Sequence, residues 1–170
     1  MAYVASINKD YFANQLSIPT LIGSGQFSVA KQTELAAFIA VHEKVALRDI
    51  LGDDLYTAYQ SGLSTSPIPP RITALKAQLV DATAKTSPLA NYVWYKWQQT
   101  HQQFTTAQGD RAMTSDNLTT SYATELYVSV WNEMVDDLAD FYDWLGDNIA
   151  DYPEYDGTIF NLKYINALGI

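Results

Sequence analysis

Two stretches decide the fold: residues 87–104, SPLANYVWYKWQQTHQQF, and residues 118–145, LTTSYATELYVSVWNEMVDDLADFYDWL. In both, large apolar side chains recur at three- and four-residue steps, the period of an amphipathic helix. The polar stretch TTAQGDRAMTSDN, residues 105–117, separates them. Its Gly, Thr, Ser, Asp and Asn residues predict a loop or a small β-hairpin. The sequence therefore predicts two long helices joined by a polar insert.

Start signals support both long helices. Ser87 suits the N-cap, and Pro88 suits the first helical position. Asp116 or Asn117 can cap the second long helix. The expected apolar stripes are Trp94, Trp97, His101 and Phe104 on the first helix, and Tyr122, Leu126, Val130, Met134, Leu138, Phe141 and Leu145 on the second. An aromatic stripe at helical spacing favours a core position over base or sugar stacking, although Tyr92 and Tyr95 beside it can anchor a neighbouring subunit.

Three further helices are expected earlier in the chain, over residues 29–51, 54–61 and 71–82. Gly52 is a natural stop between the first two, and Pro70 can open the third. The spaced apolar positions of the first are Leu35, Phe38, Ile39, His42, Val45, Ala46 and Ile50. Together with the two long helices, they predict an all-α bundle of about four to five helices.

The two ends of the chain look irregular. We expect one domain over residues 1–170: an N-terminal arm at 1–28, the bundle at 29–150 and a C-terminal arm at 151–170. A short helical turn near Lys9–Gln15 is possible. The C-terminal arm carries Ile159, Phe160, Leu162, Tyr164, Ile165, Leu168 and Ile170. Apolar surface gains about 25 cal/mol per Å² on burial, so this arm should pack on its own domain or dock on a neighbour.

Composition excludes several classes of function. The net charge is −9 with only ten Lys and Arg, which argues against neutralising the phosphates of nucleic acid or binding an anionic membrane surface. The chain has no Cys, which excludes disulfides and thiolate metal sites. We find no signal-peptide pattern at the start and no apolar run near the ~20 residues of a membrane span. A soluble protein made and used in a cytoplasm is expected.

Catalytic motifs are incomplete or absent. His42-Glu43 begins a zinc-protease motif, but Ala46 stands where the second histidine is required. A di-iron bundle requires Glu three residues before His, and those positions hold Ile39 and Gln98. Neither a Gly-x-Ser-x-Gly elbow nor a phosphate-binding glycine loop occurs. We therefore expect no enzyme activity, cofactor or metal; an active site from distant residues is the least favoured alternative.

An acidic row follows one face of the second long helix: Asp136, Asp140, Asp143 and Asp147. Such a row is most often a solvated face opposite the apolar stripe. The alternatives are a divalent-cation site, a face for a basic partner, or a surface that repels DNA.

Three strings carry a family resemblance: HEKVALRDILGDDLYTAYQSGL (residues 42–63), SPLANYVWYKW (residues 87–97) and VWNEMVDDLADFYDWL (residues 130–145). Their most specific parts are Glu43 with residues 51–56, residues 87–92 and residues 131–135. Over residues 33–145 the chain resembles small proteins of crAss-like and other Bacteroidetes phages, which are similar to the head–tail connector, or adaptor, proteins of tailed phages.

The resemblance implies a helical subunit of a homo-oligomeric ring, usually dodecameric, at the neck of the virion. Such a ring binds the portal protein and the tail or further neck proteins, while genomic DNA passes through its channel without specific binding. It implies contacts in the insert and the C-terminal arm. The expected contact residues are Asp110, Arg111, Met113, Phe160, Tyr164, Ile165 and Ile170. The alternative is a small cytoplasmic helical domain with a binding or regulatory role.

Overall fold

The computed structural model describes residues 3–13, 16–18, 26–101, 103–106, 109–112, 117–157 and 159–166, without the side chains of 26–28 and 101–124. Within this part of the chain there are four α-helices and one β-hairpin. The helices are α1 (Gln26–Leu63), α2 (Pro70–Leu79), α3 (Pro88–His101) and α4 (Asn117–Asp147), the strands are β1 (Gln103–Thr106) and β2 (Gly109–Ala112), and two short 3-10 turns are Lys9–Phe12 and Ile149–Asp151. The predicted all-α bundle is confirmed.

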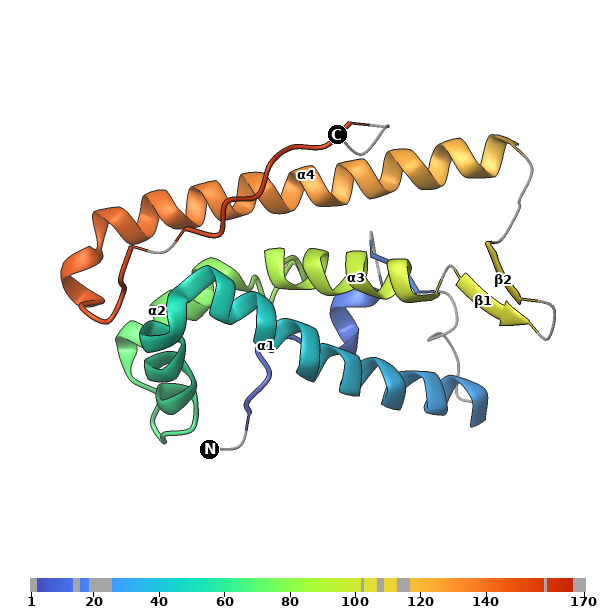
Figure 1. Ribbon diagram of the computed structural model, residues 1–170. Helices are drawn as coiled ribbons and strands as arrows, with labels where there is room; N and C mark the ends of the chain where they lie inside the picture. Colours follow the sequence, from blue (N-terminus) through green and yellow to red (C-terminus); the bar gives the residue numbers. More distant parts are fainter. Residues whose placement is uncertain are drawn as a thin grey trace.

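Helix α3 is the centre of the bundle. It packs against α1 on one side and α4 on the other (Figure 1). All residues from Leu89 to Trp94 are buried, as expected for a helix covered on several sides. Its predicted start is confirmed, because Ser87 Oγ accepts a hydrogen bond from Leu89 N–H at 3.1 Å and donates one to the Leu79 carbonyl at 2.7 Å.

Gly52 divides α1 as the sequence predicts. Its φ of 73° and ψ of 167° interrupt the helix, and residues with a Cβ rarely adopt this conformation. The helices expected over 29–51 and 54–61 are thus the two halves of one kinked helix. Of the expected apolar positions, Leu35, Ile39, Ala46 and Ile50 are buried, Phe38 and His42 are half-buried, and Val45 is exposed.

Helix α2 ends earlier than predicted. The expected helix over 71–82 stops at Leu79, and Val80 is extended. Asp81 then begins a turn in which its Oδ1 accepts hydrogen bonds from the N–H groups of Thr83 and Ala84, at 2.7 and 2.8 Å. Such local side-chain bonds compete with helix continuation, which explains the difference.

The insert forms a hairpin, and it begins before the predicted residue 105. Phe104 was expected on the stripe of the first long helix, which is wrong: that helix ends at His101, and Phe104 pairs with Arg111 between antiparallel β1 and β2. β-branched Thr105 and Thr106 favour strand geometry. At the far end of the hairpin, Thr106 lies opposite Gly109.

The N-terminal segment is irregular, as predicted, but it contributes to the core. Its 3-10 turn contacts both α1 and α3. Five of its apolar side chains are buried: Ile7, Tyr11, Phe12, Leu16 and Ile18. The described part of this segment is therefore an integral layer of the fold, which the sequence pattern did not indicate.

Helix α4 is much longer than the helix beneath it. Its 31 residues span about 46 Å, while the 14 residues of α3 span about 21 Å. Among its described side chains, from Glu125 onward, Leu126 is half-buried against the core and Val130, Met134, Leu138, Phe141 and Leu145 are buried. The beginning of α4 and the hairpin therefore extend from the same end of the bundle (Figure 1).

Gly62, near the end of α1, lies too close to α2 for a larger residue. A Cβ at this position would lie 2.5 Å from Ile72 Cγ1, whose side chain is buried. We expect Gly62→Ala to lower the free energy of unfolding by about 1–3 kcal/mol, measured by urea denaturation. The control is Gly146→Ala in α4, where an added Cβ meets nothing within 4 Å. Wild-type stability of Gly62→Ala would contradict the close packing of α1 on α2.

Candidate interaction surface

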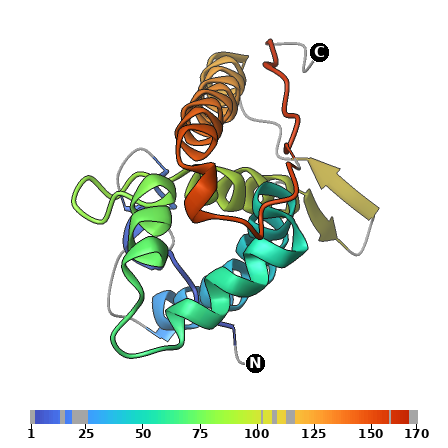
Figure 2. The ribbon, with the colours of Figure 1, turned by 90° about the vertical axis from the view of Figure 1, so that its left-hand side faces the viewer.

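Residues 159–166, here called the C-terminal strap, run back along α4 without regular secondary structure (Figures 1 and 2). Side chains of α4 hold its backbone. Trp131 Nε1 donates a hydrogen bond to the Lys163 carbonyl at 2.8 Å. The Asn132 amide donates to the Ile165 carbonyl at 3.0 Å and accepts from the Ile165 N–H at 2.9 Å. The sequence left two alternatives for the apolar C-terminal arm: packing on its own domain or docking on a neighbour. In this structure the strap packs on its own domain.

Tyr142 fixes the beginning of the strap. Its hydroxyl accepts a hydrogen bond from Phe160 N–H at 2.8 Å and donates one to the Ile50 carbonyl at 3.1 Å. One side chain of α4 therefore joins the strap to α1. Burial raises the pKa of Tyr142 to about 12, so the hydroxyl keeps its proton for the donated bond at neutral pH.

The expected contact residues lie on two different elements. Phe160, Tyr164 and Ile165 belong to the strap. Phe160 is half-buried near Tyr92, with ring centroids 6.3 Å apart. Tyr164 is exposed, and its hydroxyl donates a hydrogen bond to the Asp136 carboxylate. Asp110 and Arg111 lie on β2, where the structure describes the backbone only, and Met113 and Ile170 lie outside the described residues.

The α4 residues that hold the strap were not identified from the sequence. Trp131 and Asn132 lie beside the apolar stripe of α4. Side chains with hydrogen-bond donors are common at such positions, so they gave no signal of a binding role. Their backbone partners lie 32 and 33 residues further along the chain. No helical or strand periodicity connects residues at such a separation, so the only available signal was the apolar character of the arm itself.

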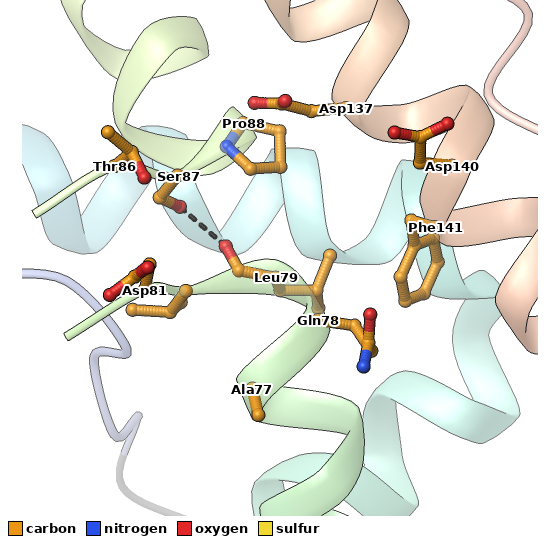
Figure 3. Close-up of a pocket in the computed structure, with 11 residues that line it drawn as sticks. Ala77, Gln78, Leu79, Asp81, Thr86, Ser87, Pro88, Asp137, Asp140 and Phe141 are labelled. Carbon is orange, nitrogen blue, oxygen red and sulfur yellow. Dashed lines mark hydrogen bonds between the residues drawn. The ribbon is translucent and has the colours of Figure 1, made fainter. Parts of the chain in front are cut away.

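An acidic pocket of about 220 Å³ lies between α2, the start of α3 and α4 (Figure 3). Asp137 and Asp140 of α4 border it on one side and Asp81 on another. Hydrogen bonds from the turn after Asp81 lower the pKa of that carboxyl group. Within the described residues, no group of three or more His, Asp or Glu side chains is arranged to hold a metal ion. The predicted acidic row is exposed at all four positions, Asp136, Asp140, Asp143 and Asp147.

Asp137 gives this pocket a pH dependence. Burial, with the neighbouring charges of Glu133 and Asp140, raises its pKa to about 6. The folded state therefore binds this proton more tightly than the unfolded chain, and the resulting stability is present near pH 4 and lost as the pH rises through 6. We expect the free energy of unfolding of Asp137→Asn to exceed that of wild type by about 1 kcal/mol at pH 7.5, a value discounted for the partial exposure of this side chain. At pH 4 the two free energies should be equal. Thermal unfolding across pH measures this, with exposed Asp143→Asn as control. No pH-dependent difference for Asp137→Asn would contradict the burial of Asp137.

A second pocket, of about 610 Å³, lies at the kink of α1. It opens between α1 and the beginning of the strap, and its apolar lining comes from Val45, Ile159 and Phe160. Val45 and Ile159 are exposed, with 44% and 63% of their surface accessible. The polar lining consists of Arg48, Asp49, Asp53 and Asp156. Arg48 Nε donates a hydrogen bond to Asp53 at 2.8 Å, so this pocket combines an apolar strip with an ion-paired rim.

Glu43 is fully buried beneath the N-terminal segment. Its Oε1 accepts a hydrogen bond from Ser6 N–H at 2.6 Å, and Ser6 Oγ bonds to the Tyr59 hydroxyl at 2.8 Å. The Tyr3 hydroxyl lies beside the same carboxylate, yet neither Tyr3 Oη nor Glu43 Oε2 completes a hydrogen bond of standard geometry. Burial raises the pKa of Glu43. This enclosed cluster holds the N-terminal segment and offers no access to a substrate.

The central aromatic residues belong to the core. Trp94 and Trp97 are 2% and 3% exposed, which confirms the prediction and excludes base stacking by these two rings in this state. Tyr92 is also buried, so it is not available as a surface anchor. Tyr95 is half-buried and packs on Trp131, with ring centroids 4.6 Å apart.

His42 has the environment of a packing residue. It is half-buried and lies against the Phe38 ring, with centroids 4.0 Å apart. Burial and the nearby Lys96 lower its pKa, which keeps the imidazole neutral at physiological pH. His42 was expected among the spaced apolar positions of the helix over 29–51, and this half-buried placement agrees with that expectation.

No helix in the described part of the chain combines the length and apolar character that a bilayer crossing requires. No protein-family model matches the chain, and no curated protein or solved structure matches it significantly. The arrangement of exposed elements on the helical core is therefore the basis for the functional argument.

Proposed function

We propose that this protein is a structural subunit of a phage head–tail connector, which forms a homo-oligomeric ring between the portal and the tail. The observation that carries the proposal is the end of the molecule where α4 and the hairpin extend past α3. The hairpin contacts mainly itself and the adjacent end of α3. A helix end and a hairpin that extend past the central helix are suited to contacts with another subunit.

The accessible surface supports an assembling subunit. The chain exposes 10161 Å², while a compact monomer of its 19.0 kDa exposes about 8,400 Å². The difference of about 1,800 Å² is about twice the roughly 800 Å² that one partner contributes to a standard protein–protein interface. Exposed apolar side chains of α1, at Val29, Val41 and Val45, add surface of the kind that interfaces cover.

Charge supports a role beside passing DNA. The net charge is −9, and the acidic row of α4 points to solvent along the second half of this helix. A channel through which DNA slides benefits from a wall that does not bind phosphate, because phosphate binding requires clustered Lys and Arg. The proposal assigns no catalytic residue and no cofactor.

The pocket at the kink of α1 favours a second function. An apolar strip with an ion-paired rim has the character of a small-ligand or peptide site, and this suits a helical binding or regulatory domain. We rank this function second because the apolar strip includes two exposed side chains that an assembly interface covers equally well.

Negative-stain microscopy of the purified protein, alone and mixed with portal protein of the same phage, tests the proposal. The expected result is a ring, or a layer of this protein on the portal ring. A monomer that does not bind portal and whose kink pocket takes a small ligand would support the binding domain instead.

A further inference from the structure

The face of α4 under the strap binds peptide backbone. Four hydrogen bonds join Trp131, Asn132 and Tyr142 to main-chain atoms of the strap. Asn132 satisfies both the N–H and the C=O of one residue, Ile165, as a neighbouring β-strand would. These side chains form a site for an extended chain, in which affinity comes from the backbone and from few side chains of the peptide.

None of the apolar side chains of the strap is fully buried. Ile159 and Tyr164 are 63% and 59% exposed, while Phe160, Leu162 and Ile165 are half-buried. Segments that have no regular secondary structure and no fully buried side chain open at lower free-energy cost than the core. The strap can therefore leave α4 without unfolding the bundle.

The chain just before the strap is anchored much more firmly. The Tyr152 side chain is 1% exposed, and its hydroxyl donates to the Arg71 carbonyl at 2.9 Å. Arg71 forms a bidentate ion pair with Glu154, with N···O distances of 2.7 and 2.8 Å. Between the anchor and the strap stands Gly157, with φ of 83° and open space around its Cβ position. Gly157 is thus placed as a hinge.

We propose that the face of α4 formed by Trp131, Asn132 and Tyr142 is an intersubunit receptor, and that its occupant in the assembly is the strap of a second copy. This inference rests on the proposed assembly role. A second copy is the fitting occupant because its strap presents the same backbone atoms that this face already binds. The hinge lets the strap change partners while Tyr152 and Glu154 stay anchored to α2.

The hinge tests the proposal in the full-length chain. Proline cannot adopt a positive φ, so Gly157→Pro prevents the strap from returning to its own α4. Asparagine tolerates a positive φ, so Gly157→Asn is the matched control. We expect Gly157→Pro to form concentration-dependent dimers or larger closed oligomers under conditions where Gly157→Asn behaves as wild type, measured by light scattering after gel filtration. Adding Asn132→Ala should return Gly157→Pro to the state of the control.

Two outcomes would overturn the exchange: Gly157→Pro remains in the same state as Gly157→Asn at every concentration, or its oligomers survive Asn132→Ala. If Gly157→Pro does not fold, the binding of a fluorescent peptide of residues 158–170 to the full-length protein tests the proposal instead. Fluorescence anisotropy should show at least tenfold weaker binding to Asn132→Ala than to wild type, and equal or no binding would overturn the proposal.

Wild-type rings that neither Gly157→Pro nor Asn132→Ala alters would refute the exchange alone. Strap exchange without any ring or portal binding would refute the connector function alone.

Discussion

Trp97→Ala is expected to lower the free energy of unfolding by about 3–5 kcal/mol, the usual cost of removing a buried large aromatic side chain. Trp97 lies on the central helix α3, is 3% exposed, and meets the Phe38 ring edge-on with centroids 5.2 Å apart. Its loss leaves a cavity between α3 and α1. Urea denaturation followed by circular dichroism measures the change.

Val41→Ala on the outer side of α1 is the matched control. Val41 is 58% exposed, so its truncation should change stability by no more than about 0.5 kcal/mol. A Trp97→Ala variant with wild-type stability but reduced binding to single-stranded nucleic acid would contradict the core role. That result would restore the base-stacking interpretation of the aromatic stripe.

Glu43→Ala is expected to cost about 2–4 kcal/mol, since it leaves the buried Ser6 N–H without its acceptor and opens a cavity. Glu43→Gln keeps an acceptor of the same shape and should retain the fold. Lys44→Ala, at the next position on the exposed side of α1, is the control. Thermal unfolding of the three variants at pH 7 measures the difference. Equal stability of Glu43→Ala and Lys44→Ala would contradict the role of Glu43 in holding the N-terminal segment.

The pH dependence of Glu43→Gln gives an independent check. Burial raises the pKa of Glu43 in the folded state, so folding favours the protonated carboxyl group. This stabilisation is fully present below the unfolded pKa of about 4.3 and is lost as the pH rises through the folded pKa. The stability of Glu43→Gln relative to wild type should therefore increase between pH 4 and pH 8. A constant difference over this range would show that the carboxyl group is not desolvated.

Local sequence signals predicted the helical core well. Ser87 and Pro88 mark the start of α3, Gly52 marks the kink of α1, and the spacing from Val130 to Leu145 marks the buried side of α4. Each signal acts within one or two helical turns, where capping, φ preferences and periodicity dominate. The predicted end of α3 at Phe104 is wrong. Phe104 lies in a strand and pairs with Arg111, and helical periodicity cannot indicate such a strand partner.

Contacts between distant segments could not be predicted. Ser6 and Glu43 are 37 residues apart, and Asn132 and Ile165 are 33 residues apart. Burial of Glu43 contradicts its usual surface preference, and only the N-terminal segment that covers it explains the exception. The apolar character of the strap indicated that another part of the protein or a partner covers it. It did not indicate that α4 does so, or which face of α4 is involved.

The most direct test of the proposed connector role is native mass spectrometry of the wild-type protein with the assembled portal protein encoded by the same genome. The account predicts a closed ring of this protein bound to the portal ring, with stoichiometry fixed by the ring symmetry. A double variant of the hairpin, Asp110→Ala with Arg111→Ala, should weaken that complex while Asp143→Asn on the exposed row leaves it intact. A folded protein that stays monomeric and forms no complex with the portal would contradict the account.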